Sequence, residues 1–459
     1  MRALGWGIAT IVAIGALTIA SSAAARTFEV TKRSDPAPGP CKSDDCSLRE
    51  AIRAANAHAG ADRVLLPSKK TYDLSIANTT GGENNALEGD LDVKNGPLLI
   101  AHLGKGRATI DAHGIDRVFD VFQGAPTHFV KLVIRGGDQP TGDGFGGGIQ
   151  STNANLTLTA TSVTHNRAVS EDGGGIAFPE GNASLTLSRS GVTHNFSGAA
   201  GGGLSFTNGG TGHLTIGRSR LAGNESSARG GGLFTAVQAR ITRTTVSGNQ
   251  SDLGSGGGAA IEGLEGTSVI RDSTISGNTA ATEGGGLVVD FTPATHVENS
   301  TITGNHTASN GGGLWVIASG AVSLNAVTVA RNSADGSGGG LFSQNTKPFK
   351  VENSLIALNT AASTGNDCAE GGAPGEEFDS LGHNLLSTLA GCHGFDGPAD
   401  LVKAKPRIGI LGRYGGPTET IPLTKGSPAI GHAKRSTAPK RDQRGHNRDR
   451  HPDDGAYER

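Results

Sequence analysis

Aliphatic residues alternate with Thr and Ser along most of the chain, as in Leu156-Thr157-Leu158. This alternation is typical of strands with one buried face, because successive side chains of a strand point to opposite sides. A pair of aliphatic positions five residues apart recurs in eight successive copies. The pairs are Leu158 and Val163, Leu187 and Val192, Ile216 and Leu221, Ile241 and Val246, Ile270 and Ile275, Val297 and Ile302, Leu324 and Val329, and Val351 and Ile356.

Asparagine and glycine follow the same rhythm. An Asn lies three residues after the second aliphatic of each pair, at Asn166, Asn195, Asn224, Asn249, Asn278, Asn305, Asn332 and Asn359. Triple glycines begin at Gly146, Gly173, Gly201, Gly230, Gly256, Gly284, Gly311 and Gly338, in steps of 26 to 29 residues. A repeat of this length indicates an architecture of stacked units.

The repeat predicts an all-β fold, a right-handed parallel β-helix with about 27 residues per turn. Eight turns stacked at the strand spacing of a sheet would span about 35 Å. The Asn side chains are expected to form an amide ladder between coils, and the glycines to supply tight turns. Some of these Asn residues lie in Asn-x-Ser/Thr triplets, but the Asn recurs whether or not the triplet is complete, which favours the ladder over glycosylation.

One short helix is expected, over residues 48 to 57. Ser47 and Glu50 form a capping box, and Leu48, Ala51 and Ile52 give one apolar face. Such a helix would close the open end of the solenoid, where unpaired strand edges would otherwise promote aggregation.

The strands that follow the glycine triplets can be aligned from coil to coil. Their outward positions place aromatic and acidic side chains on one outer face. Phe234, Trp315 and Phe342 form an outward stripe with Val288, and Glu262 and Asp290 fall on neighbouring coils. One interpretation is a saccharide groove, with an aromatic ligand-binding platform beside paired acids. The favoured alternative is that residues 366–459 fold back over the stripe and bury it, since large exposed apolar patches are uncommon.

No catalytic set is assigned from these residues. A lyase would need a basic residue near Glu262 and Asp290, and the aligned positions offer only the distant Lys94. His165 and His194 occupy equivalent places in adjacent coils, but two histidines without a third ligand indicate a surface stack rather than a metal site. No cofactor and no metal are expected.

Composition and charge argue against some classes of binding partner. The chain has 73 Gly in 459 residues, 4% aromatic residues and a formal net charge of -2. This balance gives no electrostatic case for nucleic acid or an anionic membrane as partner. The basic stretch from Lys434 to Arg450 is expected to be a solvated tail or a wrapped cap.

The N-terminus and the cysteines indicate export. Residues 1–25 have a charged start, an apolar core and Ala23-Ala24-Ala25, as in a secretory signal peptide. Disulfides are expected between Cys41 and Cys46 and between Cys368 and Cys392. We expect no transmembrane segment in the mature chain, and a location that is secreted, on the cell surface or periplasmic.

Several motifs resemble a group of bacterial exported proteins. Cys46-Ser-Leu-Arg-Glu-Ala-Ile52 resembles the CSLREA domain, and the middle resembles the repeats of polymorphic outer membrane proteins. Five short C-terminal segments resemble the "choice-of-anchor Q" region: Ser380-Leu-Gly-His-Asn384, Gly415-Gly-Pro-Thr418, Gly426-Ser-Pro-Ala-Ile430, Asp442-Gln-Arg-Gly445 and Gly455-Ala-Tyr-Glu458. Family members usually place Asp after Ser-Pro-Ala-Ile, whereas this chain has Gly431.

The resemblance implies a right-handed parallel β-helix of the pectin-lyase type, on or outside the cell. We expect a cap at 26–89, repeats at 90–365 and a C-terminal region at 366–459, and the resemblance carries over no catalytic residues. The function expected from the sequence is an exported, non-catalytic, adhesin-like scaffold that binds polysaccharide or a host or cell-surface glycan. The alternative is a polysaccharide lyase or glycoside hydrolase on the same fold.

Overall fold

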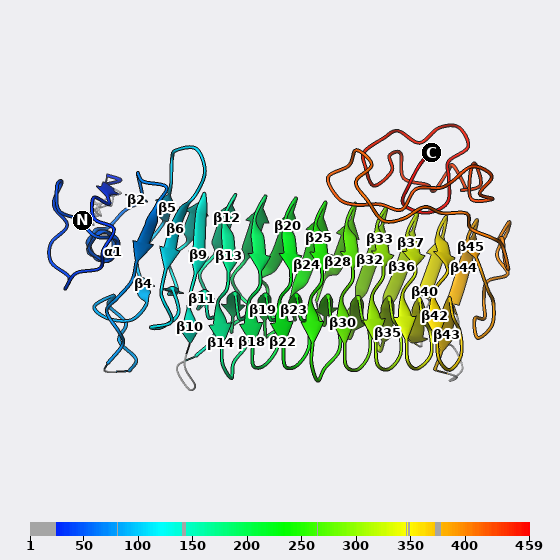
Figure 1. Cartoon of the computed structure of the whole chain (residues 1–459), viewed down its shortest axis with the longest axis horizontal. Coiled ribbons are helices and arrows are strands. Elements are labelled where there is room, and N and C mark those ends of the chain that lie inside the picture. The colour runs from blue at the N-terminus through cyan, green and yellow to red at the C-terminus, as the bar shows by residue number, and fades with distance from the viewer. Residues whose placement is uncertain are drawn as a thin grey trace, which may run out of the picture.

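The structure is a computed structural model that describes residues 24–79, 81–139, 144–263, 265–345, 347, 349–371 and 378–459. The predicted signal peptide lies almost wholly outside these residues and stays a prediction. The described chain is a parallel β-helix, an elongated stack of coils that runs from the blue N-terminal end to the orange end in Figure 1.

Each full coil passes through four short strands, one in each of four parallel sheets. The described residues place 13 strands in sheet A, 12 in sheet B, 11 in sheet C and nine in sheet D. Sheet A contains β1 (Thr27–Glu29), β2 (Asp62–Leu65), β5 (Leu98–Ala101), β8 (Thr127–Val130), β12 (Leu156–Thr159), β16 (Leu185–Ser188), β20 (His213–Gly217), β24 (Gln238–Thr242), β28 (Thr267–Arg271), β32 (Ala294–Glu298), β36 (Ala321–Asn325), β40 (Phe349–Glu352) and β44 (Phe378–Gly382). Sheet B contains β3 (Thr71–Asp73), β6 (Ala108–Asp111), β9 (Leu132–Arg135), β13 (Ser162–Thr164), β17 (Gly191–Thr193), β21 (Arg220–Ala222), β25 (Thr245–Ser247), β29 (Thr274–Ser276), β33 (Thr301–Thr303), β37 (Thr328–Ala330), β41 (Leu355–Ala357) and β45 (Leu385–Leu386).

The other two sheets close each coil. Sheet C contains β4 (Leu91–Val93), β7 (Phe119–Val121), β11 (Ile149–Ser151), β15 (Ile176–Phe178), β19 (Leu204–Phe206), β23 (Leu233–Thr235), β27 (Ala259–Ile261), β31 (Leu287–Asp290), β35 (Leu314–Ile317), β39 (Leu341–Gln344) and β43 (Cys368–Glu370). Sheet D contains β10 (Asp138–Gln139), β14 (Arg167–Ala168), β18 (Phe196–Ser197), β22 (Glu225–Ser226), β26 (Gln250–Ser251), β30 (Thr279–Ala280), β34 (His306–Thr307), β38 (Ser333–Ala334) and β42 (Thr360–Ala361).

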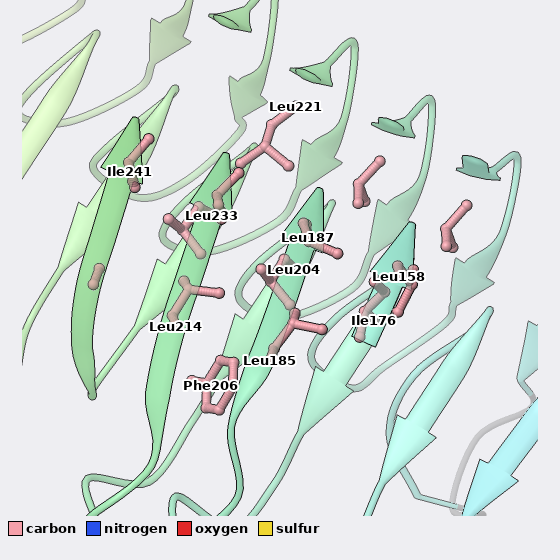
Figure 2. Packing of buried hydrophobic residues seen from close by; sticks show 14 of the residues in the cluster. Leu158, Ile176, Leu185, Leu187, Leu204, Phe206, Leu214, Leu221, Leu233 and Ile241 are labelled. Atoms are coloured by element: carbon pink, nitrogen blue, oxygen red, sulfur yellow. The ribbon is translucent and has the colours of Figure 1, made fainter. Parts of the chain in front are cut away.

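The aliphatic positions predicted to point inward form one continuous core. In Figure 2, side chains such as Leu158, Leu187 and Leu233 fill the space between the sheets. Each stacks on its equivalent in the next coil, because register partners such as Leu158 and Leu187 face each other across paired strands. The predicted fold class is therefore confirmed from the strand pairing alone.

The amide ladder runs through the whole set of repeats. In each coil the Asn backbone N–H and the side-chain Nδ2 both donate to the Oδ1 of the next Asn, as from Asn166 to Asn195 at 3.0 Å each. The Nδ2 also donates to a carbonyl of the preceding coil, so that the Oδ1 and Nδ2 of the buried amides are both satisfied. The last step goes from Asn359 to the Asp367 carboxylate, with Nδ2 and Oδ1 3.1 Å apart.

The triple glycines are explained by crowding as well as by backbone conformation. The first glycine of each triplet has a positive φ, for example 72° at Gly173. A Cβ on the second, Gly174, would lie 2.1 Å from the Phe196 carbonyl oxygen. A Cβ on the third, Gly175, would lie 2.8 Å from the ladder amide of Asn195. The glycines therefore let the backbone pass directly against the amide ladder.

A second ladder, made of hydroxyl groups, was missed by the sequence analysis. The backbone N–H of Thr161 donates to Ser190 Oγ at 3.2 Å, and that of Ser190 donates to Ser219 Oγ at 3.1 Å. The same contact continues through Thr244, Ser273 and Ser300. These residues lie at the corner between sheets A and B, where they satisfy backbone donors that the turn leaves without a strand partner.

The N-terminal cap follows from its sequence motif. Helix α1 (Leu48–Asn56) begins at the predicted capping box of Ser47 and Glu50, and Cys41 is bonded to Cys46 just before it. Arg49 is fully buried and pairs with Asp35, while it also donates to the Asp90 carbonyl at 3.0 Å. The motif therefore ties the helix to the first coil of sheet C.

The solenoid is longer than the predicted repeat range of 90–365. Strands β1, β2 and β3 of the N-terminal region pair into sheets A and B, and β43, β44 and β45 extend the sheets beyond residue 365. These coils lack the glycine triplet and the ladder Asn, which is why the periodicity did not reveal them. The second disulfide, Cys368 to Cys392, joins β43 to the loop after β45, with the pairing that was predicted.

The expectation that residues 366–459 cover the aromatic stripe of sheet C is wrong. This C-terminal segment folds back along the outer face of sheet B, beside β33 and β37 in Figure 1. Gln443 is buried there and accepts a hydrogen bond from Thr301 Oγ1 at 2.7 Å, while Ala456 N–H donates to Thr328 Oγ1 at 3.0 Å. Two of the apolar residues expected to form the cover, Leu381 and Ile410, are exposed.

We predict that Asn278→Ala lowers the free energy of unfolding by at least about 3 kcal/mol. The substitution leaves both donors of Asn249 and the buried Val246 carbonyl without their partner, and each such loss costs about 1–3 kcal/mol. Denaturant unfolding of the full chain measures the change. Asn182→Ala, an exposed Asn off the ladder, is the control and is expected to change stability by less than about 0.5 kcal/mol. Equal effects of the two substitutions would contradict the role assigned to the ladder.

Candidate functional site

Glu262 and Asp290 lie on adjacent coils, as predicted, but a third residue joins them. Arg229 precedes the glycine triplet of the neighbouring coil and pairs through Nη1 with Glu262 Oε1. The same Nη1 lies 3.6 Å from Asp290 Oδ2. The expectation that no basic residue lies near these acids is therefore wrong. Arg229 was missed because it lies in a turn and not at an aligned strand position.

Burial changes the proton affinity of Asp290. Loss of solvent raises the pKa of Asp290 from 3.8 to about 6, the nearby Glu262 adds to this, and Arg229 opposes it. The Asp290 side chain is 6% exposed, so it is not presented to a ligand as an open nucleophile. The arrangement is that of an ion cluster held by one guanidinium.

The aromatic stripe does not form a platform. Trp315 and Phe342 are only 7% and 5% exposed, and they pack with Val288, Ala260 and Ala369 in a small cluster outside the main core. Trp315 Nε1 donates to Gln344 Oε1 at 3.1 Å. Phe234 is partly buried against the same cluster. The stripe is covered by its own neighbours, so Trp315 and Phe342 do not present ring faces to a saccharide.

His165 and His194 form the surface stack expected from the sequence. Their ring centroids are 5.1 Å apart with an interplanar angle of 15°. Neither ring belongs to a set of three metal-ligating side chains in the described part of the chain.

A basic groove lies between the solenoid and the C-terminal segment. Its cavity volume is about 450 Å³. Five cationic residues line it: Arg240, Arg243 and Arg271 from sheet A and its corner, and Lys440 and Arg441 from the C-terminal segment. Asp272 and Asp442 are its acidic residues, and Asp442 is paired with Arg444. The side chains around the groove therefore carry more positive than negative charge.

The basic surface continues along the solenoid. Arg189, Arg218 and Arg243 take the same corner position in three consecutive coils, each just after its sheet A strand and each with a positive φ near 50°. The first two extend the groove by about 10 Å at the coil spacing. The sequence contained a signal, an Arg at three successive corners, but it gave no indication that Lys440 and Arg441 fold back beside them.

A second polar cavity, of about 370 Å³, lies at the N-terminal end of sheet C. It is lined by Asp90, Asp116, Arg117, Asp120 and other residues. Asp92 and Asp120 are register partners on β4 and β7, and one oxygen from each of Asp90, Asp92 and Asp120 lies within 4.8 Å of the others. Burial raises the pKa of all three carboxyls, and that of Asp92 reaches about 7. These three residues are the described ones that could together hold a metal ion.

Comparisons with known proteins add the following. No protein-family model matches the chain, and no curated protein matches it. Among solved structures, a pectate lyase, Pel9A, is similar at 16% identity with a TM-score of 0.46, over 95% of this chain and 96% of that chain. At this level the likeness says nothing about activity. In the described residues no helix is long and apolar enough to cross a membrane.

The raised pKa of Asp290 predicts a pH-dependent stability difference. The folded chain keeps a proton that the unfolded chain loses between about pH 3.8 and 6, so the stability contributed by Asp290 falls as pH rises through this range. We predict that Asp290→Asn removes this slope, so that the variant gains stability relative to the parent from the low to the high end of the range.

Urea unfolding of both proteins at several pH values tests this. Glu265→Gln, at an exposed acid on a following loop, is the control and is expected to show no such trend. A stability difference for Asp290→Asn that stays constant across the range would contradict the assignment.

Proposed function

We propose that the protein is an exported scaffold that binds anionic glycans in the basic groove between sheet A and the C-terminal segment. The observation that carries the proposal is the convergence of Arg240, Arg243, Arg271, Lys440 and Arg441 on one cavity. Guanidinium groups bind carboxylate and sulfate oxygens through paired hydrogen bonds, so a uronic-acid or sulfated polysaccharide suits the groove.

The shape of the surface favours a polymer over a small anion. The corner arginines Arg189 and Arg218 continue the groove along the coil axis, so a chain with regularly spaced negative charges could contact several coils. The residues that line the groove include no aromatic side chain. Single-stranded nucleic acid is usually bound with base stacking on aromatics, and this favours glycan as the partner.

A non-catalytic role is supported by the state of the paired acids. Arg229 pairs with Glu262 and lies 3.6 Å from Asp290, so both acids are engaged in an ion cluster, and the nearby Trp315 and Phe342 are buried. A polysaccharide lyase or hydrolase remains the alternative function. It is favoured by one observation, the joint presence of Asp90, Asp116, Asp120 and Arg117 around the N-terminal cavity.

The proposal includes an extracellular location and membership of the CSLREA and choice-of-anchor Q group. Both cysteine pairs are disulfide-bonded, as is usual outside the cytosol. The motifs behind the resemblance have structural roles here. Thr418 Oγ1 donates to the Asp272 carbonyl, and Gly455 N–H donates to that of Asn353, so both attach the C-terminal segment to the solenoid.

We predict that the mature chain binds polyuronate or sulfated glycans more tightly than neutral glucans, and that salt weakens the binding. Lys440→Ala/Arg441→Ala should reduce the affinity about tenfold, since two partly exposed ion pairs contribute about 0.5–1 kcal/mol each. Calorimetric titration with defined oligosaccharides measures this.

Lys69→Ala/Lys105→Ala removes the same charge from exposed positions of the N-terminal coils and is the control. Equal loss in both double variants, or equally tight binding of single-stranded DNA, would contradict a glycan site. Release of reducing ends or of unsaturated products during incubation would establish the catalytic alternative instead.

A further inference from the structure

The N-terminal end of sheet C collects more negative charge than its surroundings compensate. Asp92 and Asp120 point outward from paired strands, and Asp90 lies just before β4. All three are buried, at 5%, 0% and 6% exposure for Asp90, Asp92 and Asp120. Asp116 lines the adjoining cavity. Buried carboxylates at this spacing are costly unless a positive charge lies between or beside them.

The cations nearby account for only part of this charge. Arg117 Nε lies 2.8 Å from Asp90 Oδ2, and its Nη1 donates to the Phe145 carbonyl and to Gln150 Oε1. Lys94 is exposed, and its ammonium donates to Asn85 Oδ1. Gln150 Nε2 donates to both oxygens of Asp120. With Glu83, which also lines the cavity, five carboxylates therefore face two cationic side chains, Arg117 and the exposed Lys94.

Asp92 gives an independent indication of a missing partner. Its Oδ2 accepts a hydrogen bond from Ala86 N–H at 2.5 Å. Its Oδ1 is buried and has no hydrogen-bond partner among the described residues, although the side chain contributes to the group of oxygens within 4.8 Å of one another. A fully buried carboxylate oxygen without a donor is rare in folded proteins, and a bound cation is one way in which such an oxygen is satisfied.

We propose that Asp90, Asp92 and Asp120 bind a calcium ion at this end of the solenoid. The donor atoms are all oxygen, with neither His nor Cys in the group, which suits a hard cation and not zinc. The three carboxylates come from two successive coils, and the adjoining cavity leaves room for water oxygens to add to them, which suits an ion that accepts many oxygen ligands. Calcium accepts six to eight oxygens in irregular geometry, whereas magnesium requires a near-ideal octahedron.

The proposed ion would join the cap to the solenoid. Asp92 holds the loop at Ala86, and Asp90 gives its carbonyl to the buried Arg49 of helix α1. Asp120 belongs to the next coil. Calcium bound by all three carboxylates therefore fixes the cap against the first two coils of sheet C. This inference does not depend on glycan binding in the basic groove, which lies on other strands.

Calcium binding to the chelator-treated full chain tests the proposal. Calorimetric titration with calcium chloride should show one site, and calcium should raise the melting temperature in a concentration-dependent manner. Asp92→Asn and, separately, Asp120→Asn should each weaken calcium binding by about tenfold or more, because affinity at such sites depends on the number of charged ligands. Circular dichroism verifies that each variant is folded.

Glu262→Gln and Asp290→Asn provide the matched control, since they remove acids from neighbouring coils on the same face of sheet C. They should leave calcium binding unchanged. The calcium site is refuted if the parent chain shows neither binding heat nor a shift in melting temperature, or if the control variants lose as much affinity as Asp92→Asn. Magnesium that binds as tightly as calcium would refute the choice of ion. All variants should bind anionic glycan as the parent does, which separates this result from the proposed function.

Discussion

The stacking of each coil on the next, at the spacing of hydrogen-bonded strands, is the constraint on which the rest of the structure depends. At about 4.8 Å, every side chain lies directly against its equivalent one coil away. A repeated residue is therefore stable only if it is compatible with a copy of itself. Aliphatic residues satisfy this requirement by packing. Asparagine satisfies it because each one donates to its copy in the next coil and accepts from its copy in the preceding coil. Serine and threonine satisfy it by accepting from the backbone of the neighbouring coil.

The same constraint explains how much of the fold the sequence could predict. Residues that are compatible with copies of themselves have to recur at a fixed spacing. The aliphatic pairs and the ladder Asn residues do so, and they therefore allowed the β-helix to be predicted from the sequence. The hydroxyl ladder was also present in the sequence but is interrupted by Val327, and Ser and Thr are too common elsewhere to stand out. Helix α1 and both cysteine pairs were predicted because their signals are local.

Contacts between distant segments could not be predicted in this way. The C-terminal segment docks on sheet B through Gln443 and a few backbone groups, none of which repeats. The apolar stripe of sheet C was expected to need a cover, but Trp315 is buried by Val288 and Phe342 on the coils to either side, as stacking itself requires. Arg229 was missed for a related reason, because its reach to two other coils depends on a turn.

Charged residues are the least compatible with copies of themselves, because like charges repel. A place where two of them stack therefore indicates where a compensating charge is needed. Two unit charges about 5 Å apart repel by about 3 kcal/mol at an effective dielectric constant of 20. Sheet C has two such acidic pairs on one face. Between Glu262 and Asp290 the chain supplies Arg229, which contacts both carboxylates and offsets one of their two negative charges. Beside Asp92 and Asp120 the chain places Arg117, which pairs with Asp90. One buried carboxylate oxygen has no donor at each place, Asp290 Oδ1 at the first and Asp92 Oδ1 at the second, but among the described residues only the second place brings three carboxylate oxygens within 4.8 Å of one another. One guanidinium serves two carboxylates at the first place and three at the second, so the larger excess of negative charge, and with it the place for an external cation, lies at the second.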